Sequence, residues 1–236
     1  MLKTLLISGC TKGIGLAIVN KFAQMGFHIA GCARNPEDIL NLQKKMEKQY
    51  PGQQFFFEVC DVSKKEWIQK FAQDALHNLG NIDVLINNAG TFAPGQIQNE
   101  EEDIFEKLMD TNISSAYHLT RAILPNMLHN KQGHIFNICS TASIKAYTNG
   151  GSYCISKYAM MGLNQVLREE LKGKKIKVTA VLPGATLTHS WSQSDLPESR
   201  FIPATDIAKL VWSAYDLSES TNVEEILVRP VLGDID

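Results

Sequence analysis

The chain has 236 residues, of which 44% are hydrophobic, and its formal net charge is −2. This length and apolar content are enough for one substantial core, so we expect a single domain over residues 1–236. The scattered Lys and Arg residues argue against nucleic acid as a partner. No run of eighteen apolar residues predicts a membrane span, and the first apolar run is too short for a signal peptide, so we expect a cytoplasmic protein.

Short apolar runs rich in β-branched and aromatic residues recur at regular intervals and predict strands. These runs occupy residues 5–7, 29–32, 55–59, 84–86, 135–139, 178–182 and 226–228. Between them lie longer stretches of helical period, such as Trp67, Phe71, Ala75 and Leu79. The alternation predicts an α/β, doubly wound fold, with a seven-stranded, mostly parallel sheet and helices on both faces. Ligands of such sheets bind at the carboxyl ends of the strands.

The first predicted strand leads into a glycine-rich loop that opens a helix. The loop reads Gly9-Cys10-Thr11-Lys12-Gly13-Ile14-Gly15. Glycines allow backbone N–H groups to approach a pyrophosphate, and the helix N-terminus adds a partial positive charge that holds the anion. The spacing G-x-x-x-G-x-G differs from the commoner G-x-G-x-x-G fingerprint, and an ordinary glycine-rich turn is the alternative interpretation.

Tyr153 and Lys157 are four residues apart on a predicted helix, so their side chains share one face. A free phenol has a pKa of about 10, and a Tyr that exchanges a proton near neutrality needs its anion stabilised by about 4 kcal/mol. A neighbouring cation supplies a field of the required sign. The pair therefore indicates a Tyr acid/base, whereas a packed ring beside a solvated Lys is the structural alternative.

Further motifs follow the predicted strands in a fixed order. Asn87-Asn88-Ala89-Gly90 comes after the fourth strand, Ser140 after the fifth, and Pro183-Gly184 after the sixth. Together with the glycine loop and the Tyr153–Lys157 pair, they cover nearly the whole chain and resemble the short-chain dehydrogenase/reductase family. The resemblance implies a Rossmann-type fold, hydride transfer to or from a carbon bearing oxygen, and assembly into homodimers or homotetramers.

The resemblance also implies a role for four residues. Tyr153 would donate or accept the hydroxyl proton, and Lys157 would lower the pKa of Tyr153 and hold the nicotinamide ribose. Ser140 would hydrogen-bond the substrate oxygen, and Asn112 matches the residue that anchors a proton-relay water. Without the resemblance, Asn112 reads as a capping or surface amide and Ser140 as a strand-end hydroxyl.

The choice of cofactor follows from the charge after the second predicted strand. An NAD site usually has Asp or Glu there, whereas NADP needs a cation for its 2′-phosphate. This chain has Arg34 at that position, and Lys12 lies in the glycine loop. A guanidinium can bind the phosphate through two hydrogen bonds and an ammonium as a point charge, so we favour NADP(H) over NAD(H). The alternative is that both are ordinary surface cations.

The resemblance assigns further dinucleotide contacts along the chain. Asp61 and Val62 correspond to the adenine contact, the segment Asn88-Ala89-Gly90 lies along the adenosine ribose, and the segment after the sixth strand fixes the nicotinamide carboxamide. The residues of that last segment are Pro183, Gly184, Thr186 and Thr188. Ser8 stands where the family commonly has Thr and keeps the hydroxyl.

Residues 186–204 show no clear period, and a loop of this length usually closes over or contacts a ligand. Its Trp191 either stacks on a flat substrate ring or anchors the loop to the body. Phe92, Tyr147, Trp191 and Phe201 are candidates for an aromatic substrate pocket. Thr205-Asp206 is expected to cap a helix with apolar positions from Ile207 to Leu217.

The chain end lacks the V-D-G-G sequence common in 3-oxoacyl-[acyl-carrier-protein] reductases. With Gly133-His134-Ile135-Phe136 and Trp191, this end resembles more the bacterial sepiapterin-reductase-like subgroup, which acts on pterin side-chain ketones. An acyl-carrier-protein ketoreductase remains the alternative, followed by a non-catalytic dinucleotide sensor. A sensor is expected to have lost Tyr, Lys or Ser from the site, and here all three are present.

Two other groups of residues have simpler interpretations. The five cysteines form no C-x-x-C pair and the histidines lack metal spacing, so we expect reduced core thiols and no metal site. The acidic run Glu100-Glu101-Glu102-Asp103 precedes a predicted helix that begins near Ile104. Carboxylates at that position complement the helix dipole.

Overall fold

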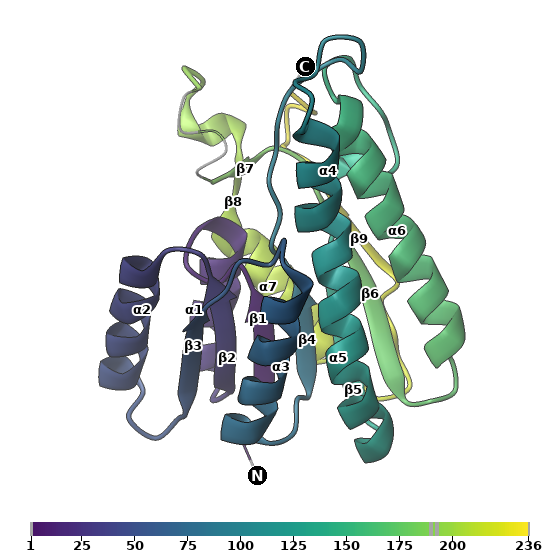
Figure 1. Ribbon diagram of the computed structural model, residues 1–236. Helices are drawn as coiled ribbons and strands as arrows, with labels where there is room; N and C mark the ends of the chain where they lie inside the picture. Colours follow the sequence, from purple (N-terminus) through teal and green to yellow (C-terminus); the bar gives the residue numbers. More distant parts are fainter. Residues whose placement is uncertain (1, 189–190, 192–193, 236) are drawn as a thin grey trace.

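The computed structural model describes residues 2–188, 191 and 194–235 (Figure 1). The strands of its main sheet are β1 (Thr4–Ser8), β2 (His28–Ala33), β3 (Phe55–Val59), β4 (Val84–Asn87), β5 (Gly133–Ile138), β6 (Ile176–Pro183) and β9 (Glu225–Val228). They lie in the order β3-β2-β1-β4-β5-β6-β9, and every neighbouring pair is parallel. The predicted strands are confirmed, with ends that differ by one or two residues.

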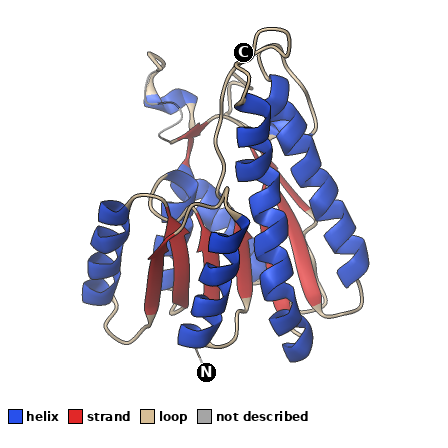
Figure 2. Cartoon of the chain, viewed as in Figure 1, coloured by secondary structure: helices blue, strands red, loops and turns tan. Residues whose placement is uncertain are grey.

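Helices cover both faces of this sheet (Figure 2). They are α1 (Gly13–Gln24), α2 (Pro36–Gln49), α3 (Lys65–Leu79), α4 (Ile104–Met109), α5 (Ser115–Asn130), α6 (Gly151–Leu171) and α7 (Ala204–Tyr215). Successive strand residues point to opposite faces, so Leu5 and Ile7 pack under α1, α2 and α7, whereas Leu6 packs under α3, α5 and α6. Because both faces are buried, the strands are almost wholly apolar, and the doubly wound α/β fold is confirmed.

A small second sheet forms at the two ends of the segment 186–204, in which the sequence shows no clear helical or strand pattern. β7 (Thr186–Leu187) pairs in parallel with β8 (Ile202–Pro203), and Ile202 N donates to Ala185 O at 2.9 Å. A 3-10 turn occupies Glu198–Arg200. Strands of two residues carry too little pattern to be predicted. The pairing brings the two ends of the segment together.

The predicted helix cap at Thr205-Asp206 is wrong. Helix α7 begins at Ala204, and the residue before it, Pro203, makes no side-chain capping bond. Pro203 belongs to β8, and its ring fixes φ near the value that leads directly into a helix. Asp206 therefore lies in the first turn, where it pairs with Lys209 at 2.8 Å. The helix ends at Tyr215, so Leu217 lies beyond it.

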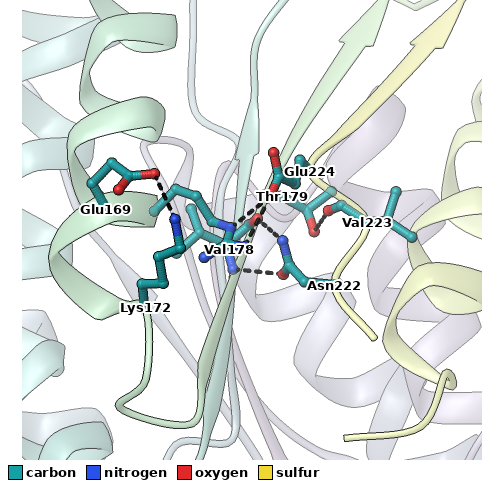
Figure 3. Close-up of polar contacts among 8 residues, drawn as sticks. Glu169, Lys172, Val178, Thr179, Asn222, Val223 and Glu224 are labelled. Carbon is teal, nitrogen blue, oxygen red and sulfur yellow. Dashed lines mark hydrogen bonds and ion pairs between the residues drawn. The ribbon is translucent and has the colours of Figure 1, made fainter. Parts of the chain in front are cut away.

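The edge strand β9 is held to β6 by side chains as well as by the strand ladder (Figure 3). Val178 N donates to Asn222 Oδ1 at 3.1 Å, and Asn222 Nδ2 donates to Val178 O at 3.2 Å. Thr179 Oγ1 donates to Val223 O at 2.6 Å. The two bonds of Asn222 pair backbone groups of β6 that lie before the ladder to β9 begins.

The C-terminal tail lies against the segment that follows β6. Arg200 donates from Nη1 to Gly233 O at 2.9 Å and from Nη2 to Asp234 O at 3.0 Å. A Cβ on Gly184 would lie 3.3 Å from Asp234 Oδ1. The tail is thus bound to Arg200, near one end of the 186–204 segment, and passes close to Gly184, just before its other end. Among the described residues, no helix combines the length and the hydropathy needed to cross a bilayer.

Candidate active site

The carboxyl ends of the parallel strands meet at the upper edge of the sheet in Figure 1. Gly9 follows β1, Asn88 follows β4 and Ser140 lies two residues after β5, while Gly184 comes directly after β6. The order of the strands places β1 beside β4, β4 beside β5, and β5 beside β6. The predicted motifs therefore share one edge, which is where parallel sheets bind ligands.

The glycine loop is folded too tightly for side chains at its glycines. Gly9 and Gly13 have φ values of +70° and +53°, which disfavour residues with a Cβ. A Cβ on Gly15 would lie 2.0 Å from the carbonyl oxygen of Gly9. Lys12, the residue before α1, makes no side-chain cap. Because Lys12 does not cap them, the first N–H groups of α1 suit the binding of an anionic pyrophosphate.

The loop after β4 is bound to the glycine loop. Asn88 Nδ2 donates to Ser8 O and to Gly9 O, each at 2.9 Å. Ser8 Oγ accepts from Asn88 N at 3.1 Å and from Ala89 N at 3.0 Å. The Ser8 hydroxyl thus joins the ends of β1 and β4. Nearby, a Cβ on Gly90 would lie 3.6 Å from Lys157 Nζ, so the backbone of this loop passes close to the predicted catalytic Lys.

Tyr153 and Lys157 lie in the first two turns of α6. Lys157 is 6% exposed, and its Nζ donates to Ile138 O, at the end of β5, at 3.0 Å. The same Nζ lies 5.9 Å from the centroid of the Tyr153 ring. The predicted proximity of the two side chains is therefore present in the structure.

Asn112 lies in a π-helical turn, Asp110–Ser114, between α4 and α5. Its Nδ2 donates to Thr91 O at 3.0 Å and to Ser156 Oγ at 2.9 Å, and its Oδ1 accepts from Thr91 N at 2.8 Å. The buried amide thus joins the loop after β4 to α6, one residue before Lys157. Single π turns recur at functional sites, because they free a backbone carbonyl from the helical pattern. The sequence does not indicate Ser156 as a partner.

Ser140 begins a short 3-10 turn, Thr141–Ser143, that packs against α6. Ser140 Oγ accepts from Ala142 N at 3.1 Å, and Ser143 Oγ accepts from Ser140 N at 3.1 Å. This reciprocal capping box fixes the Ser140 side chain and leaves its O–H proton available for a substrate oxygen. Ser143 is a residue that the sequence interpretation missed, although the S-x-x-S spacing of a capping box is visible there.

The four aromatic candidates for the substrate pocket make separate contacts. Phe92 packs edge-on against Tyr153, with ring centroids 4.9 Å apart. Trp191 packs against the buried Phe201, with ring centroids 5.2 Å apart. This contact agrees with the alternative in which Trp191 anchors the loop to the body. Tyr147 lies near Tyr153, and burial, followed by the neighbouring Tyr153, raises the pKa of the Tyr147 hydroxyl well above its usual value.

The candidate phosphate-binding cations lie directly after β2 and in the glycine loop. Arg34 is exposed directly after β2, and Lys12 Nζ lies 3.0 Å from Asp38 Oδ2. Asp61 Oδ1, after β3, accepts from Ser63 N at 3.0 Å, and Val62 is buried. Asp38 was not identified from the sequence. Its ion pair with Lys12 is partly exposed, and ion pairs of this kind are weak.

The segment after β6 completes the edge. Thr186 Oγ1 donates to Gly184 O at 2.9 Å, and Gly184 N donates to Val228 O at 2.8 Å. Thr188 lies beside the glycine loop, because a Cβ on Gly13 would lie 3.0 Å from Thr188 Cγ2. This places the segment expected near the nicotinamide against the loop expected to hold the pyrophosphate.

The thiols are buried side chains of the core. All five cysteines are free and buried. Burial raises the pKa of Cys10 to about 12 and that of Cys139 to about 11. Thiols of such high pKa are poor nucleophiles and ligands. The described part of the chain contains no cluster of three potential metal-ligating side chains.

Comparison with known proteins agrees with this arrangement. The family model for short chain dehydrogenases matches residues 3–198. A sepiapterin reductase of Chlorobaculum tepidum is 32% identical over 239 aligned positions, which cover 98% of this chain and 97% of that protein. A metagenomic short-chain oxidoreductase, solved in complex with NADP, shares 29% identity with a TM-score of 0.84 and covers 97% of both chains.

A further solved structure shows the same fold at lower identity. An alcohol dehydrogenase from the archaeon Thermococcus sibiricus, complexed with 5-hydroxy-NADP, has a TM-score of 0.93 at 24% identity and covers 100% of both chains. The family model extends over most of the chain, and the full-length relative exceeds 30% identity. The chain belongs to the short-chain dehydrogenase family of oxidoreductases.

Proposed function

We propose that this chain is an NADP(H)-dependent oxidoreductase that reduces a carbonyl compound or oxidises the matching secondary alcohol. The observation that carries the proposal is the buried Lys157 ammonium beside the Tyr153 ring, on a helix against which the Ser140 turn packs. A single dinucleotide-binding domain over residues 1–236, with substrate contacts from 186–204, is part of the proposal.

Tyr153, Lys157 and Ser140 have different roles at the substrate oxygen. Bound dinucleotide supplies or removes the hydride at the carbon atom. In reduction, Tyr153 donates its phenolic proton to the oxygen, and Lys157 stabilises the phenolate that remains. Ser140 donates a hydrogen bond to the same oxygen, where negative charge develops. The Asn112 amide is already bonded to Ser156 and Thr91. A relay water near Asn112 would therefore be bound by a backbone group and not by this amide.

NADP(H) is the proposed cofactor. Arg34 follows β2 at the position where an acidic side chain would accept the ribose hydroxyls of NAD, and Lys12 stands in the neighbouring loop. A 2′-phosphate placed between them would gain two charge-assisted contacts. The relative with 29% identity was solved with NADP, which supports the same choice.

A pterin side-chain ketone or a related dicarbonyl is the proposed substrate class. The relative named a sepiapterin reductase supports this class, as does Phe92, whose ring contacts Tyr153 and offers a surface for a flat substrate. A 3-oxoacyl thioester, the second candidate, has no specific contact in its favour.

The direct test is cofactor consumption by the purified protein. NADPH and NADH are each offered with sepiapterin, simple ketones, diketones and an acetoacetyl thioester, and the loss of reduced-nicotinamide absorbance is followed. Turnover of sepiapterin with NADPH supports the proposal, and turnover of the thioester alone transfers it to the second candidate. Tight NADPH binding without turnover of any compound would favour a dinucleotide sensor.

We also propose that the chain forms a homodimer or homotetramer in the cytoplasm. Ile155, Tyr158 and Val166 form an exposed stripe on α6, and Phe105 of α4 lines the same hollow as Ile155. Burial of these side chains against a second copy would remove them from water. Free buried thiols suit a reducing compartment. Light scattering after gel filtration tests the oligomeric state, and cell fractionation tests the location.

A further inference from the structure

The sequence predicts that the acidic run 100–103 serves the helix that follows it, but Glu100 contacts a different helix. Its Oε1 accepts a hydrogen bond from Ser152 N at 2.8 Å, and its Oε2 accepts one from the Ser152 hydroxyl. Ser152 is the second residue of α6 and is 2% exposed. Glu100 therefore connects the loop after β4 to the residue that directly precedes Tyr153.

Helix α6 has no side-chain cap from its own sequence. Its N-cap residue, Gly150, has helical backbone angles (φ −90°, ψ −15°) and no side chain that accepts a hydrogen bond. The first N–H groups of a helix lack partners within the helix, and a carboxylate there satisfies them and complements the helix dipole. Glu100 supplies this carboxylate from 52 residues away in the sequence.

The surrounding backbone makes room for the Glu100 side chain. A Cβ on Gly151 would lie 2.0 Å from Glu100 Oε1, and a Cβ on Gly95 would lie 2.6 Å from Glu100 Cγ. The loop is fastened in this position, because Gly95 N donates to Asn149 O at 3.0 Å. Two glycines from separate segments thus enclose one carboxylate.

We propose that Glu100 is a positioning residue for the reaction, which fixes the first turn of α6 and with it Tyr153 and Lys157. The inference rests on the proposed function. A helix is stiff, so a shift of its first turn moves the phenol relative to the substrate oxygen. Displacements of about 1 Å at a reacting group can lower a rate about a hundredfold.

The test compares Glu100→Ala, Glu100→Gln and the neighbouring Glu102→Ala. Glu100→Ala removes both hydrogen bonds to Ser152. Glu100→Gln removes the charge but keeps an oxygen that accepts from the backbone N–H, and its amide NH2 can donate to the Ser152 hydroxyl in place of accepting from it. Glu102 is exposed and makes no side-chain hydrogen bond or ion pair within the described residues, so it is a matched control. Each protein is measured for kcat, for KM and for NADPH affinity.

We expect Glu100→Ala to lower kcat about tenfold or more while the NADPH dissociation constant changes less than about threefold. Glu100→Gln should recover most of the rate, and Glu102→Ala should behave as the wild type. A merely structural loss would lower the yield of folded protein without this separation of kcat from cofactor affinity. Wild-type kcat in Glu100→Ala, or equal losses in the Ala and Gln variants, would overturn the inference.

Hydrogen exchange of the α6 amides provides a readout that needs no substrate. We expect the amides of residues 151–154 to exchange about tenfold faster or more in Glu100→Ala than in the wild type, with Glu100→Gln close to the wild type. If the wild-type protein turns over no carbonyl compound, the proposed function fails, and this exchange still decides whether Glu100 fixes the turn. Unchanged exchange in Glu100→Ala refutes the positioning role.

Discussion

His134 is a buried titratable residue that makes the stability of this protein depend on pH. It lies in β5, is 2% exposed, and stacks on Phe136 with ring centroids 3.9 Å apart. Its Nε2 lies 2.8 Å from Thr179 Oγ1. The single Thr179 hydroxyl proton is donated to Val223 O, as Figure 3 shows, so Thr179 accepts from His134 and the imidazole proton is on Nε2.

Protonation of His134 would therefore place a proton on Nδ1, which has no hydrogen-bond partner among the described residues. Burial, with a smaller contribution from Lys177, lowers the pKa of His134 to about 3. An unfolded chain binds this proton near its ordinary pKa of about 6.5. Between these values the unfolded state holds one more proton, so the free energy of unfolding falls as the pH falls.

We expect this effect to be measurable with His134→Gln. Between about pH 7.5 and pH 4.5, the wild type should lose about 2 to 3 kcal/mol more of its unfolding free energy than the variant. Thr179→Val keeps the buried imidazole and should keep the wild-type dependence. Urea unfolding followed by circular dichroism at several pH values measures the difference. Parallel pH profiles for the wild type and His134→Gln would refute the assignment of a neutral imidazole whose Nδ1 has no partner.

Three further substitutions test the site. Tyr153→Phe should lower kcat by about a hundredfold or more and leave the NADPH dissociation constant nearly intact, because it removes only the proton donor; a comparable loss of NADPH affinity in fluorescence titration would contradict the role. Arg34→Ala should weaken NADPH about tenfold or more and NADH much less, and equal losses would contradict the phosphate contact. Gly15→Ala should abolish tight dinucleotide binding and lower the melting temperature, because its Cβ would lie 2.0 Å from Gly9 O; an unchanged dissociation constant would show that the loop relaxes freely.

The parts of the fold that follow from local patterns could be predicted from the sequence. The runs around Leu6 and Leu85 are apolar throughout because helices cover both faces of their strands, and such runs indicate a parallel sheet. The glycine loop could be located because its glycines are needed for a tight turn. Tyr153 and Lys157 share a helix, so their spacing alone brings them together.

Contacts between distant segments could not be predicted in this way. Glu100 and Ser152 lie 52 residues apart, and neither position departs from an ordinary surface pattern. The pairing of Trp191 with Phe201 depends on how the segment folds back at β7 and β8, which are too short to recognise. The use of the Asn112 amide between Thr91 and Ser156 likewise needs three segments to be placed together.

The attachment of the C-terminal tail affects how this protein can be handled. Arg200 binds the carbonyl oxygens of Gly233 and Asp234, so the chain end is held against the segment that carries Trp191. The N-terminus lies at the opposite edge of the sheet (Figure 1). An affinity tag or fluorescent fusion at the C-terminus would be anchored beside the segment that carries Trp191, whereas the same addition at the N-terminus would lie away from that segment. Immobilisation through the N-terminus is accordingly the suitable choice for kinetic work.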